Sequence, residues 1–151
     1  MIAILLILAG ANVQAEVDVL AQSKSGKVLC TNPDPATKRC SSITSFSAAA
    51  DGSMIETTEL LLTPDQPLTL TMSTGIQVAG ESFCGAMALD DLGRGKVRLN
   101  GEPLPADRHA LVLERLEASM GPLAGKKACD AIRLENDGLV KYGQVDGVDL
   151  K

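Results

Sequence analysis

Four cysteines constrain this chain more than any other feature of its sequence. They are Cys30, Cys40, Cys84 and Cys129. In a chain that leaves the reducing cytosol, an even number of cysteines favours disulfides, and four cysteines allow three pairings. Residues 31–39 are rich in turn-forming residues and contain two prolines, so we expect a loop there. Because that loop can bring its ends together, the favoured pairing is Cys30–Cys40 with Cys84–Cys129, and the other two pairings stay open.

A metal site and a redox pair are the alternatives to disulfides. No Cys-x-x-Cys spacing occurs, and the single histidine, His109, is far away in sequence. Neither alternative therefore has the spacing of residues that it needs. In the loop-entropy description of disulfide stability, the Cys30–Cys40 bridge contributes about 3 kcal/mol and the Cys84–Cys129 bridge about 4 kcal/mol.

The first fifteen residues have the pattern of a signal peptide. An apolar core at residues 2–8 is followed by Gly10 and Asn12, and Val13-Gln14-Ala15 offers short residues at the −3 and −1 positions of a cleavage site. The apolar run is about half of the ~20 residues that a membrane-spanning helix needs. No Lys or Arg precedes it, and a buried N-terminal strand or helix is the alternative reading.

Cleavage after Ala15 would divide the chain into three parts. We expect a signal peptide at 1–15, an N-terminal lead-in at 16–26 and a single disulfide-bonded domain at 27–151. The mature protein would then be periplasmic or secreted, with no stable membrane span after cleavage.

The composition argues against several kinds of partner. The 14 basic and 19 acidic residues give a net charge of −5, which does not suit nucleic acid or anionic lipid. The three aromatic residues, Phe46, Phe83 and Tyr142, offer little for base stacking or a sugar-binding platform. One histidine cannot build a multi-histidine metal centre. No phosphate-binding glycine loop, zinc signature or dinucleotide fingerprint occurs, so no cofactor is expected.

The periodicity of the chain predicts mostly antiparallel hairpins. Asp51-Gly52 and Asn136-Asp137-Gly138 are turn signals between segments rich in strand-forming residues. Apolar and polar residues alternate along 68–73, which is typical of a half-buried strand. Residues 90–95 are expected to form a loop.

One amphipathic helix interrupts these strands at about 107–120. Leu113, Leu116 and Met120 lie three or four residues apart on one face, and Gly121-Pro122 ends the pattern. The predicted fold class is therefore α+β, with this helix packed on a sheet of antiparallel hairpins and stabilised by disulfides.

Candidate catalytic residues are few. Ser82 lies in Gly-Glu-Ser-Phe-Cys-Gly, which misses the Gly-x-Ser-x-Gly nucleophile elbow by one residue. His109, in the first turn of the predicted helix, would be its general base, and an acidic residue would orient the imidazole. The simpler interpretation of His109 is a partly exposed helix residue.

Acidic loop residues are the other candidates, either as calcium ligands or as paired catalytic carboxylates. The twelve-residue calcium-loop pattern is absent, and such residues are also common in exposed turns. Two short basic pairs, Lys38-Arg39 and Lys126-Lys127, could contact an acidic partner but are typical of solvated loops. The acidic residues are Asp90, Asp91, Glu135, Asp137, Asp146 and Asp149.

The spacing of the cysteines is similar to that of a group of small secreted bacterial proteins. The shared pattern is Cys-x9-Cys-x-x-Ile ending at Ile43, then Phe-Cys-Gly at 83–85, then Gly-Lys-Lys-Ala-Cys at 125–129 after a helix. It covers most of Gly26 to Leu150. The resemblance implies export and disulfides, and it implies no activity and no functional residue. Small periplasmic lysozyme inhibitors share the size and compartment, which is a class-level analogy.

From these observations we expect a non-enzymatic envelope protein, which binds or inhibits another protein or a cell-wall component through its loops. A small hydrolase using Ser82 and His109, or acidic loop residues, is the first alternative. A structural subunit of an envelope assembly is the second, and an exposed apolar patch or an unpaired edge strand would favour it.

Overall fold

The computed structural model of this chain describes residues 18–135 and 138–150. The signal peptide predicted at 1–15 lies outside the described residues, as do Asn136 and Asp137 of the second predicted turn. No helix in the described part of the chain is long and apolar enough to cross a membrane.

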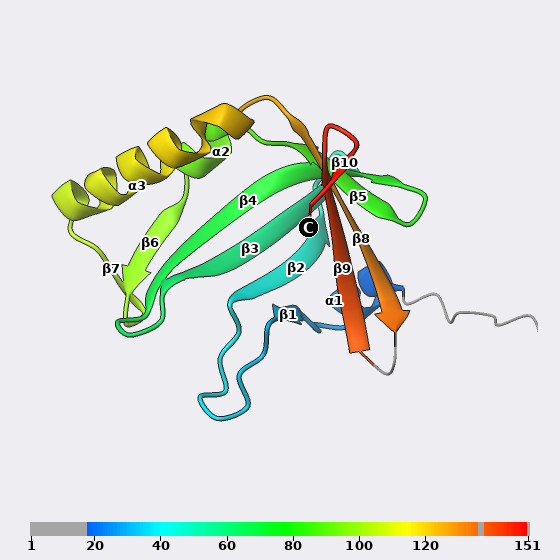
Figure 1. The fold of residues 1–151 in the computed structure, drawn as a ribbon, viewed down its shortest axis with the longest axis horizontal. Coiled ribbons are helices and arrows are strands. Elements are labelled where there is room, and N and C mark those ends of the chain that lie inside the picture. The colour runs from blue at the N-terminus through cyan, green and yellow to red at the C-terminus, as the bar shows by residue number, and fades with distance from the viewer. Residues whose placement is uncertain (1–17, 136–137, 151) are drawn as a thin grey trace, which may run out of the picture.

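The structure is mostly antiparallel sheet, with a few helices and two disulfides, so the predicted α+β class is confirmed only in part. The strand order is β1-β2-β3-β4-β5-β8-β9-β10, and β6 and β7 extend the sheet beside one part of β4 (Figure 1). The strands are β1 (Leu29–Thr31), β2 (Ser42–Ala48), β3 (Met54–Thr63), β4 (Leu68–Ala79), β5 (Ser82–Ala86), β6 (Lys96–Leu99), β7 (Glu102–Pro103), β8 (Lys127–Glu135), β9 (Gly138–Val145) and β10 (Val148–Asp149).

Strand β4 divides the sheet into two lobes. Its first residues, Leu68 to Thr71, pair with β6, and its last, Gln77 to Ala79, pair with β5. The alternation seen at 68–73 therefore belongs to a strand that is 12 residues long and serves both lobes. In Figure 1 the β6–β7 end of the molecule and the β8–β9 hairpin lie at opposite sides of β4.

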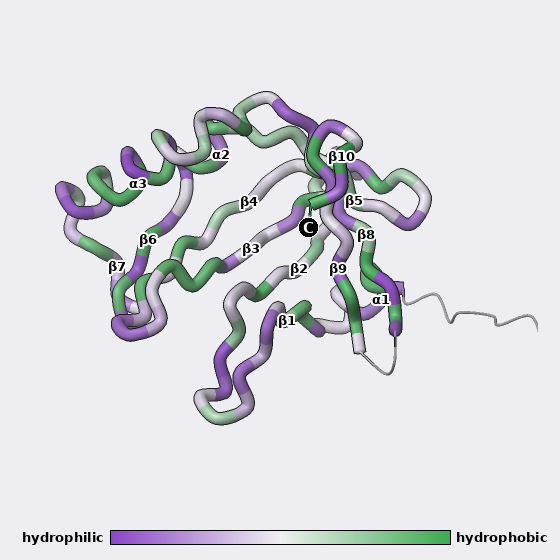
Figure 2. Tube along the Cα trace, viewed as in Figure 1, coloured by the Kyte–Doolittle hydropathy of each residue, from purple (hydrophilic) through white to green (hydrophobic). Residues whose placement is uncertain are grey.

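The predicted helix covers the first lobe. Helix α3 spans Ala106–Met120 and buries Leu113 against Leu70 and Val97, with Leu116 and Met120 packed around them. Hydrophobic and hydrophilic residues alternate around α3 in Figure 2, as expected for a helix with one buried face.

Helix α2 (Leu89–Gly93) completes this core, so the prediction of a loop at 90–95 was wrong for its first residues. Only 1% of Leu92 is exposed, because this side chain enters the same core. A five-residue helix is too short to show a helical period in the sequence.

A second core lies in the other lobe, around Phe46, Ile76 and Val19. Val19 belongs to α1 (Val19–Lys24), so part of the segment expected as a lead-in packs against the sheet. The Ser23 hydroxyl fixes α1 to β2, because it accepts a hydrogen bond from the Phe46 N–H at 2.8 Å and donates one to the Phe46 carbonyl at 3.0 Å. The rings of Phe46 and Phe83 stack with their centroids 4.8 Å apart.

The favoured disulfide pairing is present in the structure. Cys30 and Cys40 close the loop before β2, with Cα atoms 5.4 Å apart. Cys84 and Cys129 lie directly opposite each other on β5 and β8, with Cα atoms 4.1 Å apart. This second bridge joins the strands on either side of the α2–α3 segment, so it ties the two halves of the chain together.

Candidate functional site

The structure does not bring Ser82 and His109 together. Ser82 begins β5, whereas His109 lies in the first turn of α3, and Figure 1 places these parts at opposite sides of the molecule. The His109 Nε2 lies 3.0 Å from the Gly95 carbonyl oxygen. Because a carbonyl only accepts, this nitrogen carries the hydrogen and donates it. His109 thus holds the loop before β6 and is not positioned to act as a base for Ser82.

Four of the six predicted acidic residues form local contacts, namely Asp91, Glu135, Asp146 and Asp149. Asp91 forms an ion pair with Arg94. The Asp146 carboxylate accepts a hydrogen bond from the Lys127 N–H at 2.9 Å, and Asp149 accepts one from the Gln144 amide at 2.7 Å. Asp137 lies outside the described residues. Within the described residues, no group of three or more His, Cys, Asp or Glu side chains could hold a metal ion.

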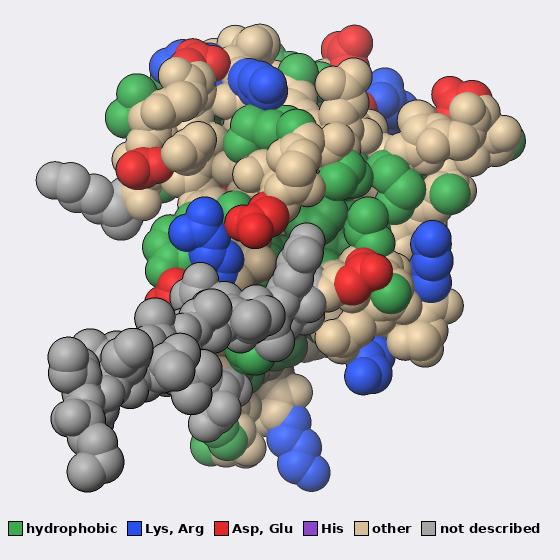
Figure 3. Space-filling model, turned by 90° about the vertical axis from the view of Figure 1, so that its right-hand side faces the viewer, with side chains coloured by type: hydrophobic (Ala, Val, Ile, Leu, Met, Phe, Trp, Pro, Cys, Tyr) green, Lys and Arg blue, Asp and Glu red, His purple; other side chains and the backbone are tan. Residues whose placement is uncertain are grey.

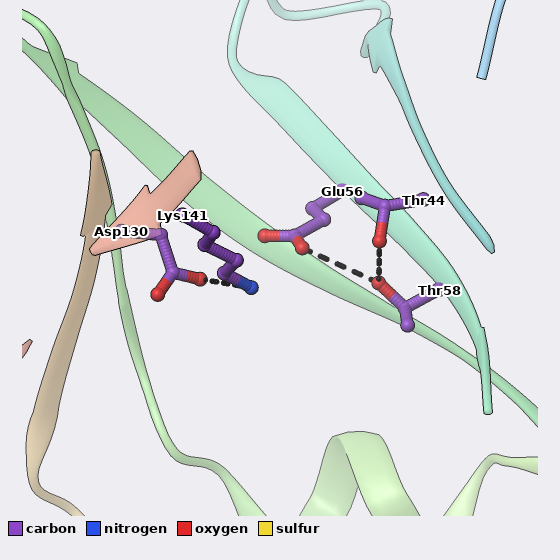
Figure 4. Close-up of polar contacts among 5 residues, drawn as sticks. All are labelled: Thr44, Glu56, Thr58, Asp130 and Lys141. Carbon is purple, nitrogen blue, oxygen red and sulfur yellow. Dashed lines mark hydrogen bonds and ion pairs between the residues drawn. The ribbon is translucent and has the colours of Figure 1, made fainter. Parts of the chain in front are cut away.

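A polar cluster lies on the inner face of the sheet, between the two apolar cores. The strand register puts Thr44 of β2 opposite Thr58 of β3, and Glu56 lies two residues before Thr58 on the same face of β3. The Thr44 and Thr58 hydroxyl oxygens are 3.1 Å apart, and Thr58 donates to the Glu56 carboxylate at 3.3 Å (Figure 4). Thr44 is only 6% exposed, which is low for a polar residue, and this hydroxyl contact satisfies it.

The β8–β9 hairpin faces this cluster with an ion pair. The Lys141 ammonium lies 2.6 Å from the Asp130 carboxylate, and Figure 4 shows the Glu56 carboxylate pointing toward the same region. Burial raises the pKa of Glu56 above its usual value of 4.5, and the nearby Lys141 opposes part of that rise. Sequence periodicity did not single out these residues, because they come from strands that only the curved sheet brings together.

A cavity of about 520 Å³, called here the outer cavity, lies beside β9. Three of its lining residues form one row across neighbouring strands, Ser82 on β5, Ala131 on β8 and Tyr142 on β9. The Arg133 guanidinium carbon lies 5.4 Å from the centre of the Tyr142 ring. Ser82 therefore lines a cavity, although His109 is remote from it. The lining is completed by Cys129, Arg133, Lys141, Gly143, Gln144, Asp149 and Leu150.

The Tyr142 hydroxyl donates a hydrogen bond to Glu135, a contact that raises the pKa of this exposed phenol. The phenol is thus held at the surface as a hydrogen-bonding group, and 43% of the tyrosine is exposed. It offers a partner both an apolar ring face and a polar edge.

A smaller pocket of about 80 Å³, called here the inner pocket, lies at the other end of β9. It is enclosed by α1, β1 and β2 on one side and by Leu139 of β9 on the other. Among the described residues that line it, Lys27 is the only charged one. The remaining lining is mainly apolar and includes Val19, Val28, Leu29, Thr44 and Phe46.

No known protein family, curated protein or solved structure matches this chain. The geometry around β9 therefore carries the functional proposal.

Proposed function

We propose that this protein is a small exported binding protein, periplasmic or secreted, which holds a partner at the surface around β9. Two disulfides suit an oxidising compartment, and the predicted signal peptide would deliver the chain there. The partner is a protein or a cell-wall component. The protein acts by binding this partner and does not catalyse a reaction.

The outer cavity is the observation that carries this proposal. A guanidinium, a phenol, an amide and a hydroxyl converge on one concave surface, from Arg133, Tyr142, Gln144 and Ser82. Convergent polar groups in a concavity are typical of recognition sites. Catalysis at Ser82 would also need a base within hydrogen-bond reach. The predicted base, His109, instead lies on α3 at the opposite side of the molecule, where it bonds to the Gly95 carbonyl oxygen.

The experiment compares retention of envelope fractions by immobilised wild-type and variant protein. Arg133→Ala combined with Tyr142→Ala strips the cavity of its largest groups, and Leu111→Ala on the exposed side of α3 is the matched control. We expect a saturable protein or glycan component to be retained by the wild type and the control and lost by the double variant. Equal retention by all three proteins, or no saturable retention, would overturn the proposal.

A structural subunit of an envelope assembly is the second candidate function. Within the described part of the chain, the outer edge of β9 is unpaired over residues 138–142, and the same strand carries exposed apolar residues. Both features favour a structural subunit, because they suit permanent association. The two functions differ in how long the protein stays bound to its partner. A structural subunit would migrate with its assembly in native extracts, whereas a binding protein would be released on dilution.

A further inference from the structure

Strand β9 has an open edge in the described part of the chain. One edge pairs with β8 from Gly138 to Val145. On the other edge β10 pairs only with Gln144 and Val145. Among the described residues, no strand therefore pairs with the outer edge of residues 138–142. An open strand edge presents unpaired N–H and C=O groups that a second chain can use.

The direction of these backbone groups follows from one hydrogen bond. The Gly143 carbonyl accepts from the Leu150 N–H at 2.8 Å, so the backbone of Gly143 points toward the open edge. In an antiparallel ladder, backbone groups of alternate residues point to the same side. The N–H and C=O groups of Lys141 and Leu139 therefore also point outward.

Each face of this edge borders a different pocket. Leu139 lines the inner pocket, and Tyr142 and Gln144, whose side chains point to the opposite face of β9, line the outer cavity. Leu139 is 48% exposed and Val140 36%, although both are large apolar residues in a strand. Figure 3 views the molecule from the β8–β9 side and shows hydrophobic side chains at the surface between charged ones. Alternate side chains of an added strand would thus meet an apolar pocket on one face and a polar cavity on the other.

We propose that the open edge of β9 binds an extended segment of a partner polypeptide by β-strand addition. This inference rests on the proposed function and specifies its partner. Main-chain hydrogen bonds to Leu139 and Lys141 would supply affinity, and pockets for alternate side chains would supply selectivity. The inner pocket of about 80 Å³ is large enough for one aliphatic side chain.

Charge favours an acidic partner segment over a second copy of this chain. Among the described residues, Lys27 is the only charged residue that lines the inner pocket. The outer cavity is lined by two basic residues, Arg133 and Lys141, against one acidic residue, Asp149. Strand β9 reads Gly-Leu-Val-Lys-Tyr-Gly-Gln-Val, with one lysine and no acidic residue. A second β9 would bring another lysine to this edge and no carboxylate. The partner segment is therefore one in which apolar residues alternate with acidic ones.

The test uses a capped eight-residue peptide of alternating valine and glutamate, followed by backbone amide NMR of the isotope-labelled protein. We expect saturable shifts at the amides of Leu139 and Lys141. Two further peptides carry N-methyl groups on all the valines or on all the glutamates. Only one set of alternate residues can donate to β9, so one methylated peptide should bind about tenfold more weakly or worse, and the other close to the parent.

Protein variants supply the matched control. Leu139→Glu places a carboxylate at the inner pocket and should abolish binding of the valine–glutamate peptide. Leu111→Glu, on an α3 residue of similar exposure (47%), should leave binding unchanged. Equal binding of both methylated peptides, shifts remote from β9, or no saturable binding would overturn strand addition. Concentration-dependent dimers that shift the same amides would assign the edge to a second copy instead.

The two proposals can fail separately. If an envelope component is retained through Arg133 and Tyr142 but the peptide does not bind, the binding function stands and strand addition is wrong. If only one of the two methylated peptides binds like the parent but no envelope component is retained, the edge of β9 can accept a strand and the proposed function is wrong.

Discussion

The Lys141 ammonium lies 2.6 Å from the Asp130 carboxylate on the inner face of the sheet, across from the half-buried Glu56. Both partners of this pair remain partly exposed, with 47% of the lysine side chain and 30% of the aspartate side chain accessible. A pair of this kind adds little stability by itself. Its consequence is electrostatic, because the charges of Lys141 and Asp130 act on the nearby Glu56 carboxylate: Lys141 lowers the pKa of Glu56 and Asp130 raises it.

Glu56 should make stability depend on pH. Burial raises the pKa of Glu56 above 4.5 in the folded chain. Between the pKa of the unfolded state and that of the folded state, the folded state therefore binds more protons than the unfolded state. Stability from this group is present below the unfolded pKa and is lost as the pH rises through the folded pKa. Glu56→Gln should therefore gain stability relative to the wild type at neutral pH and lose that advantage near pH 4. Urea unfolding at a series of pH values measures this difference, and an advantage independent of pH would contradict it.

The two disulfides should differ in their contribution to stability. Replacing Cys84 and Cys129 together by alanine opens a bridge with a sequence separation of 45, against 10 for Cys30 and Cys40. The expected losses in the free energy of unfolding are about 4 kcal/mol and about 3 kcal/mol. Urea titrations of the two double variants test the order, and a larger loss from the shorter loop would show that chain entropy does not govern it.

Gly95 should not tolerate a side chain. A Cβ atom there would lie 2.6 Å from Leu70 Cδ1 and 2.8 Å from the Leu92 carbonyl oxygen, and the latter is backbone that cannot move aside easily. Gly95→Ala should cost about 1–3 kcal/mol of the free energy of unfolding by overpacking. Gly75→Ala is the matched control, because nothing lies within 4 Å of its added Cβ. Thermal unfolding compares the two, and equal melting temperatures would contradict the packing at Gly95.

His109 should be a structural residue. His109→Ala removes its hydrogen bond to the Gly95 carbonyl and should lower the free energy of unfolding by about 1 kcal/mol. Retention of the envelope partner should not change. A loss of retention with unchanged stability would mean that the histidine contributes to binding.

Local patterns predicted much of this fold. The helix predicted at about 107–120 is present as α3, which begins one residue earlier at Ala106. It could be predicted because Leu113, Leu116 and Met120 repeat at the helical period. The disulfide pairing was correct because the turn-rich loop left one pairing favoured. Helices α1 and α2 were missed because they have 6 and 5 residues, too few to show a period.

The candidate site could not be predicted in the same way. Glu56 and Lys141 are far apart in sequence, and only the curvature of the sheet turns their side chains to one region. The open edge of β9 depends on which strands do not pair with it, and a strand sequence does not encode that by itself. Exposed Leu139 and Val140 are ordinary strand residues until their surroundings are known.

Hydrogen exchange at two amides tests the central claim most directly. The protein is measured free and in complex with the envelope component that it retains. If a partner strand adds to β9, the amides of Leu139 and Lys141 should exchange at least about tenfold more slowly in the complex, because they become paired. Unchanged exchange at both amides in a saturated complex would contradict binding at the edge of β9.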